Sequence, residues 1–362
     1  MKKSFLRIAS YLIIAVIMLY GYSTAKGTGG LELLLSPDPL LVSLMPAGLL
    51  LSIYVHVFLH EGGHFLFGKL SGYRLISFQV RRFKYSQADH SLHRMQAASP
   101  LLAGQCLMAP PKGDAAELPY RGYLLGGILA NALTGAVLYS SAFLMEAKAG
   151  FVFVLLSVVP VWMALSNVLP KAQNDGALLR EASRSLHARK LLFQQLEMAQ
   201  LIEAKVPFAD LPDAYFECLK DPQYQKSFLV DYFYMVAYVR ALGKLDFEAA
   251  DLLLHNFSAN RPVKASVYWP IYVTESLFCD TLFGRIGTAE EKFLQIQAQP
   301  LLKRYWNANN RIRAAFAFFC RVDIEGAQKL LAQLPTDVRG SSEEMENSIE
   351  MRLSSWLKSY FE

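Results

Sequence analysis

The stretch His60-Glu61-Gly62-Gly63-His64 lies near the end of a long apolar run, residues 40–70, and the organisation of the chain follows from it. Two histidines four residues apart on a helix project from the same face, so both imidazoles can bind one Zn²⁺. Glu61 lies between them, where a carboxylate can take a proton from a water molecule. Ionisable residues in a membrane-length helix usually serve a function, and the stretch therefore predicts a zinc site.

For the motif alone, the alternative is a pair of core or helix-end histidines without a metal. His56 lies one further turn back on the same helix face. A partner of the site and a packing residue are equally good interpretations of His56, so it is left outside the predicted ligand set.

The composition is typical of a protein that is partly embedded in a membrane. The chain has 362 residues, 53% of them hydrophobic, and a mean hydropathy of +0.22. Its net charge is +5, but the basic residues flank apolar runs and form no patch with interleaved aromatic residues, so we expect no nucleic-acid partner. No CxxC pair is present, which predicts four free, packed thiols: Cys106, Cys218, Cys279 and Cys320.

Four apolar runs are long enough to be membrane spans. They cover residues 8–22, 40–70, 120–145 and 151–169. The chain start and residues 71–118 are basic, which predicts a cytoplasmic location for both. We therefore expect four spans, both termini in the cytoplasm, and an outer loop rich in Gly and Pro between the first two spans. The second run is expected either to cross with tilt or to break near Pro46 and Gly48.

The basic segment between the second and third runs contains two predicted strands. Residues 75–83 have imperfect alternation, and residues 105–108 form a shorter strand that Pro110 and Pro111 terminate. A small sheet beside the predicted site would offer an edge on which an extended peptide could bind. The alternative is a flexible loop.

The third and fourth runs contain polar features that are unusual in apolar helices. Small residues in the third run predict close packing with a neighbouring helix, and Asn131 within it needs hydrogen-bonding partners. The fourth run ends in Asn167-Val168-Leu169-Pro170-Lys171-Ala172-Gln173-Asn174-Asp175-Gly176. Pro170 cannot continue a helix and Gly176 permits unusual backbone angles, so the segment between them is predicted to be unwound. Asp175 could then turn toward another helix; the alternative is an ordinary turn aspartate.

The order of these motifs resembles the intramembrane zinc metalloproteases of the site-2 protease family. The first motif matches HExxH and the last matches NxxPxxxxDG through Asn167, Pro170, Asp175 and Gly176. Between them, Gly127 and Asn131 match part of a GPxxN-like motif, with Ile128 in place of the proline, and Asn174 stands where the family commonly has leucine. The resemblance covers residues 40–180 and is closer to the compact sporulation-type members than to those with a PDZ domain.

The resemblance implies a site and a substrate class. It implies Zn²⁺ held by His60, His64 and Asp175, Glu61 as the base, and Asn167 as the donor to a developing oxyanion. Asn131, Pro170 and Gly176 would support the site structurally. The implied substrate is a membrane-spanning or membrane-inserted peptide cut near the cytoplasmic face of a bacterial plasma membrane.

The rest of the chain is predicted to be a soluble helical domain. Helix ends followed by short polar turns recur about every forty residues, at 241–250, 283–290 and 320–327, which weakly resembles tetratricopeptide repeats. Such a stack could dock a regulator. The alternative is an ordinary helical domain without a binding role.

These observations predict a mainly α protein with a membrane domain at residues 1–176, which includes a small β element, and a helical cytoplasmic domain at residues 177–362. The leading prediction for its activity is a zinc metalloendopeptidase. One alternative is a catalytically idle membrane scaffold of the same fold that binds partners through its helical tail. Another is a membrane HExxH protease of the prenyl-protein or heat-shock type, in which the third ligand is a downstream glutamate.

Overall fold

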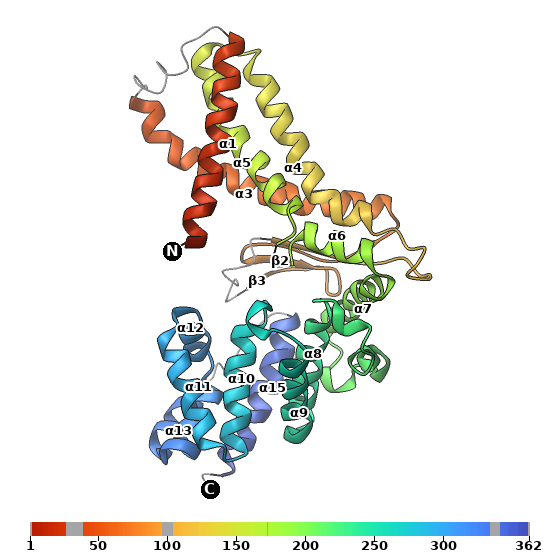
Figure 1. Ribbon diagram of the computed structural model, residues 1–362, viewed down its shortest axis with the longest axis vertical. Helices are drawn as coiled ribbons and strands as arrows, with labels where there is room; N and C mark the ends of the chain where they lie inside the picture. The colour runs from red at the N-terminus through yellow and green to blue at the C-terminus, as the bar shows by residue number, and fades with distance from the viewer. Residues whose placement is uncertain (1, 27–38, 96–103, 172, 334–340, 361–362) are drawn as a thin grey trace. The chain divides into compact units, whose positions relative to one another are not determined.

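The computed structural model describes residues 2–26, 39–95, 104–171, 173–333 and 341–360 (Figure 1). The fold is mainly α-helical with one small antiparallel sheet, as the sequence predicts. Residues 1–87 and 96–183 form one compact unit, and residues 88–95 and 184–362 form a second. The predicted outer loop falls on residues 27–38 and lies outside the described residues.

Four helices of the first unit contain the apolar runs: α1 (Lys2–Lys26), α3 (Pro39–Leu70), α4 (Arg121–Ala142) and α5 (Ala147–Val168). Within the described part of the chain, these are the helices long and apolar enough to cross a membrane, which confirms the prediction of four candidate spans. Helix α3 contacts α4 and α5, and α1 packs against α5. Helix α3 continues through Pro46, so the alternative of a break there is not observed.

The outer faces of these helices expose large apolar side chains, as expected for helices in contact with lipid. Exposed side chains of this kind include Leu12, Ile13, Val16, Ile17, Leu50, Leu51, Phe58, Leu133 and Val137. Apolar surface of this extent would be costly in water, and it supports the assignment of the first unit as a membrane protein.

Helices α3 and α4 approach each other backbone to backbone. A Cβ added at Gly63 would collide with Gly126 O, and a Cβ at Gly126 would collide with Gly63 O. This contact agrees with the close packing predicted from the small residues of the third run. It also brings the next residue of α4, Gly127, against the histidines of α3.

The sheet consists of β1 (Arg74–Val80), β2 (Phe83–Ser86), β3 (Ser91–Arg94) and β4 (Gly104–Ala109), in the order β3-β2-β1-β4. Strand β1 is antiparallel to both β2 and β4. The strand predicted at residues 105–108 is confirmed as β4. The strand predicted at residues 75–83 is confirmed as β1 up to Val80, but its extension to residue 83 is wrong, because Val80 pairs with Phe83 across a tight turn in which Arg81 has a φ of 56°. The guanidinium of Arg81 lies 5.1 Å from the ring centroid of Tyr54 in α3, a contact that sequence alternation does not reveal.

The chain leaves α5 at Val168 and enters α6 (Asp175–Arg184) after a non-helical stretch. This confirms the unwound segment predicted after Pro170, apart from residue 172, which is outside the described residues. The predicted reason for Gly176 is wrong. Gly176 is helical, and a side chain there would collide with the carbonyl oxygens of Asn167 and Val168, so this glycine permits close packing rather than an unusual turn.

The second unit consists of short helices joined by tight turns. They are α7 (Leu186–Glu203), η1 (Phe208–Asp210), η2 (Asp213–Leu219), η3 (Tyr224–Lys226), α8 (Val230–Gly243), α9 (Phe247–Asn260), η4 (Val263–Ala265), α10 (Trp269–Leu282), α11 (Ile286–Ala298), α12 (Pro300–Ala308), α13 (Asn310–Arg321), α14 (Ile324–Ala332) and α15 (Ser341–Lys358).

Three helical hairpins, α8–α9, α10–α11 and α13–α14, occur at the positions that the sequence indicates. Each connecting turn contains one residue with positive φ: Leu245 at 59°, Gly284 at 66° and Val322 at 56°. The same turn geometry therefore recurs at a nearly constant spacing along the second unit.

The core of the second unit contains a buried charge cluster. The side chain of Arg311 is 1% exposed and donates hydrogen bonds to Glu275 of α10 and Glu350 of α15. Its guanidinium also lies 4.3 Å from the ring centroid of Phe278. These contacts tie α10, α13 and α15 together.

The four cysteines are free thiols, as the sequence predicts, and Cys320 is the one that is not fully buried.

Candidate metal centre

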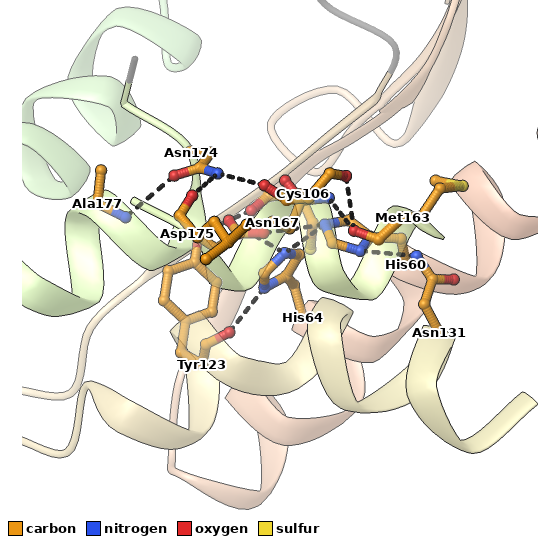
Figure 2. Close-up of polar contacts among 12 residues, drawn as sticks. His60, His64, Cys106, Tyr123, Asn131, Met163, Asn167, Asn174, Asp175 and Ala177 are labelled. Atoms are coloured by element: carbon orange, nitrogen blue, oxygen red, sulfur yellow. Dashed lines mark hydrogen bonds and ion pairs between the residues drawn. The ribbon is translucent and has the colours of Figure 1, made fainter. Parts of the chain in front are cut away.

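Three side chains from α3 and α6 converge in the first unit (Figure 2). The Nε2 atoms of His60 and His64 lie 3.2 Å apart on one face of α3. Asp175, the first residue of α6, places Oδ2 3.0 Å from His60 Nε2 and Oδ1 3.5 Å from His64 Nε2. One ligand atom from each of the three residues lies within 4.8 Å of the others.

These separations can be compared with those expected around one zinc ion. Ligand bonds of about 2.0–2.1 Å at tetrahedral angles put neighbouring ligand atoms about 3.3 Å apart. The separations His60 Nε2–His64 Nε2 (3.2 Å) and His60 Nε2–Asp175 Oδ2 (3.0 Å) lie near that value, whereas the 3.5 Å distance to His64 Nε2 is from the other carboxylate oxygen, Oδ1. His60 and His64 are 7% and 6% exposed, so the two imidazoles lie in a largely dry environment. The three residues therefore could hold one metal ion.

A backbone carbonyl orients His64. Its Nδ1 lies 2.7 Å from Tyr123 O of α4, so the Nδ1–H donates to that carbonyl, and in the neutral ring the lone pair is on Nε2. This is the tautomer in which Nε2 can bind a metal. Figure 2 shows this contact and the equivalent contact of His60 with Asn131.

Asn131 orients His60 from the opposite helix. Its side-chain amide lies 3.1 Å from His60 Nδ1, and the residue is fully buried. If His60 Nε2 binds a metal, Nδ1 must carry the proton and needs an acceptor. Among the described residues, the Oδ1 of Asn131 has no hydrogen-bond partner. Rotating the amide by 180° would let Oδ1 accept from His60 Nδ1–H, so this amide can support the metal-binding tautomer; Nδ2 would then take the position that has no partner among the described residues.

Gly127 provides the space in which the two imidazoles sit. A Cβ added to Gly127 would lie 2.5 Å from His64 Nε2 and 2.6 Å from His60 Cε1. No side chain larger than hydrogen fits at this position while both rings keep their places. The cradle therefore depends on a glycine of α4 facing the histidine pair of α3.

Strand β4 positions Glu61. The carboxylate accepts a hydrogen bond from the backbone N–H of Cys106, and it packs so closely on Gly104 that a Cβ there would lie 2.7 Å from its Oε1. The hydroxyl of Tyr123 donates to Cys106 O at 2.7 Å and holds β4 against α4. Glu61 is 7% exposed, so it has a defined position beside the histidines rather than a mobile one.

The environment of Asp175 favours its charged form. Burial by itself raises the pKa of the Asp175 carboxyl, but in the metal-free protein hydrogen bonds from the Nε2–H groups of His60 and His64 outweigh burial and lower this pKa below its usual range. The carboxylate is therefore ionised at neutral pH, as a metal ligand must be.

The remaining predicted residues lie around this centre without joining the three converging ligands. Asn167 is half-buried near the end of α5, where its Nδ2 donates to Met163 O at 3.1 Å. Pro170 is the second residue of the non-helical connection, and Gly176 packs against the carbonyl oxygens of Asn167 and Val168. His56 is buried with its Nδ1 2.8 Å from Ser52 O, which agrees with leaving it out of the ligand set.

Sequence reasoning missed the contributions of Tyr123, Cys106, Gly104 and the cradle role of Gly127. The first two act mainly through backbone atoms, which every residue carries, so no residue pattern marks them. Gly127 was recognisable as the glycine four residues before Asn131, but the sequence does not show that it faces the histidines.

Comparison of the chain with family models, with curated proteins and with solved structures gave no match. The assignment of a function therefore depends on the chemistry and geometry of the centre.

Proposed function

We propose that this protein is an intramembrane zinc metalloendopeptidase of the site-2 protease type. The observation that carries the proposal is the convergence of His60 Nε2, His64 Nε2 and an Asp175 carboxylate oxygen within a group of apolar helices. Glu61 lies in the same turn of α3 as the two histidines. A general base beside three ligands for one metal is the arrangement expected for metal-assisted hydrolysis.

When bound, zinc would lower the pKa of a water molecule and polarise the scissile carbonyl. Glu61 would accept the proton of that water and later deliver it to the leaving amine. Tyr123 O and Asn131 would keep the Nε2 atoms of His64 and His60 directed at the centre. Asn167 is the proposed hydrogen-bond donor to the developing oxyanion, a contribution worth about 3 kcal/mol in comparable sites.

The proposed substrate is a membrane-spanning or membrane-inserted peptide, or a single-span protein. The histidines lie six to ten residues before the end of α3, about 9–15 Å along the helix axis. If residues 71–118 are cytoplasmic, cleavage would occur near the cytoplasmic face. Strand β4 is at the edge of the sheet, and its edge away from Cys106 is the proposed surface for an unwound substrate, since the backbone of Cys106 already pairs with Glu61 and Tyr123.

The third proposed ligand, the carboxylate of Asp175, favours this class over other membrane HExxH proteases. Among the described residues, the group that could hold a metal contains Asp175 and no glutamate. The rival proposal of an idle scaffold gives no reason for a buried base between two oriented imidazoles.

For the second unit, we propose that the repeated helical hairpins dock a regulator or a substrate tail. We also propose that both termini are in the cytoplasm of a bacterial cell.

Removal and return of zinc tests the proposed activity. The purified protein, reconstituted into liposomes, is incubated with synthetic single-span peptides of varied sequence, and fragments are identified by mass spectrometry. We expect cleavage within the span, loss of cleavage after treatment with a zinc chelator, and recovery when Zn²⁺ is restored. Cleavage that persists after complete metal removal would contradict the mechanism. A zinc-loaded protein that cleaves none of the peptides would favour the scaffold.

A further inference from the structure

One side chain, that of Asn174, connects the end of α5 to the start of α6 (Figure 2). Its Nδ2 donates to Ser166 O at 2.9 Å and to Leu169 O at 2.8 Å. Its Oδ1 accepts from the backbone N–H groups of Lys171 and Ala177, both at 3.0 Å. These four bonds use both N–H donors and both acceptor lone pairs of the amide, all at the connection that precedes Asp175.

The two donated bonds satisfy backbone carbonyl groups at the end of α5. In a continuing helix, Ser166 O would accept from the N–H of residue 170, but that residue is Pro170 and has no N–H. Leu169 O likewise lies beyond the last helical residue, Val168. Asn174 therefore satisfies carbonyl groups that the proline and the helix end leave without an intrahelical partner.

The two accepted bonds define the start of α6. Ala177 is the third residue of the helix, so the bond from its N–H makes Asn174 the N-cap of α6. The bond from Lys171 N–H, together with the backbone bond from Asn174 N–H to Lys171 O at 3.0 Å, closes a tight turn. Within that turn, Gln173 has a φ of 66°, a conformation that needs such support in a residue with a side chain.

The next residue is Asp175, and its position depends on this turn. Because Asp175 is the first residue of α6, any change in the direction of the first turn displaces its carboxylate. That carboxylate must remain about 3.0–3.5 Å from two imidazole nitrogens on another helix. A leucine at position 174 could make none of the four bonds.

We propose that Asn174 is a positioning residue that holds Asp175 at the metal centre by joining α5 to α6. This inference rests on the proposed metal centre. Asn174 stands where the family that the chain resembles commonly has leucine. The proposal gives a structural reason for the asparagine at this position.

The test measures Zn²⁺ affinity by competition with a chromophoric chelator, and the absorption spectrum of the Co²⁺-loaded protein. Asn174→Leu should weaken Zn²⁺ binding at least about tenfold and change the Co²⁺ spectrum, as expected when a supporting partner of a ligand is lost. Asn174→Ser, which can still cap α6 but cannot reach the α5 carbonyls, should also weaken binding. The matched control is Asn309→Leu, because Asn309 caps α13 of the second unit through the same bond, to Ile312 N–H at 3.0 Å.

Wild-type affinity in Asn174→Leu would overturn the proposal, and wild-type affinity in Asn174→Ser would overturn the link to α5 as its basis. Failure of the wild-type protein to bind Zn²⁺ would contradict the metal centre itself. Hydrogen exchange of the metal-free protein distinguishes a failure of the positioning role from a failure of the metal centre. Asn174→Leu should speed exchange in residues 173–178 relative to wild type, and unchanged exchange there would contradict the positioning role even without a metal.

Discussion

Replacing Glu61 with glutamine is expected to reduce peptide cleavage by about 10²–10⁴-fold while zinc remains bound. The amide has nearly the shape of the carboxylate, and its oxygen can still accept from the backbone N–H of Cys106. The ligands His60, His64 and Asp175 are unchanged. The variant therefore loses the ability to take up a proton and keeps the rest of the site.

The measurement compares the initial rates of wild type and Glu61→Gln on whichever peptide the wild type cleaves, together with zinc content per chain. The matched control is Glu325→Gln, at an exposed glutamate of α14, which should leave both quantities unchanged. Cleavage by Glu61→Gln at the wild-type rate would show that another group is the base.

A single methyl group at Gly127 is expected to remove most of the bound metal. The added Cβ of Gly127→Ala would overlap both imidazoles, at 2.5 Å from His64 Nε2 and 2.6 Å from His60 Cε1. Neither ring has free space in which to move, because Tyr123 O and Asn131 hold their other nitrogens. Zinc content per chain and the rate of cleavage should therefore both fall by about tenfold or more.

The same substitution at Gly62 provides the control. Gly62 lies inside the histidine motif, but a Cβ added there meets no atom within 4 Å. Gly62→Ala should keep its metal, and alanine should stabilise the helix by about 0.5–1 kcal/mol relative to glycine. Equal metal content in Gly127→Ala and Gly62→Ala would contradict the proposed cradle.

The helices and the shared helix face of His60 and His64 could be predicted because their signals are local. An apolar run of membrane length specifies a helix by itself, and a spacing of four residues puts His60 and His64 on one face whatever surrounds them. The pattern around Pro170 predicted an interruption for the same reason. The prediction that Asp175 lies beside the histidines required the family resemblance as well, because His60 and His64 lie more than a hundred residues earlier in the chain.

The other features depend on contacts between distant segments. The turn at Arg81 interrupts a run that otherwise continues as a strand, and its arginine contacts Tyr54 of α3. Gly176 was interpreted through backbone freedom, whereas its purpose is to let α6 approach the carbonyl groups at the end of α5. The hydrogen bonds that Asn174 makes could not be foreseen from a residue that departs from the expected motif.

The most direct test of the metal centre is the zinc content of the detergent-purified protein, measured by mass spectrometry for wild type, His60→Ala and Asp175→Ala. We predict about one zinc per chain in the wild type and loss of zinc in both variants, since each removes one of three ligands. No zinc in a folded wild-type protein, or full occupancy in Asp175→Ala, would contradict the three-ligand centre on which the proposed function depends.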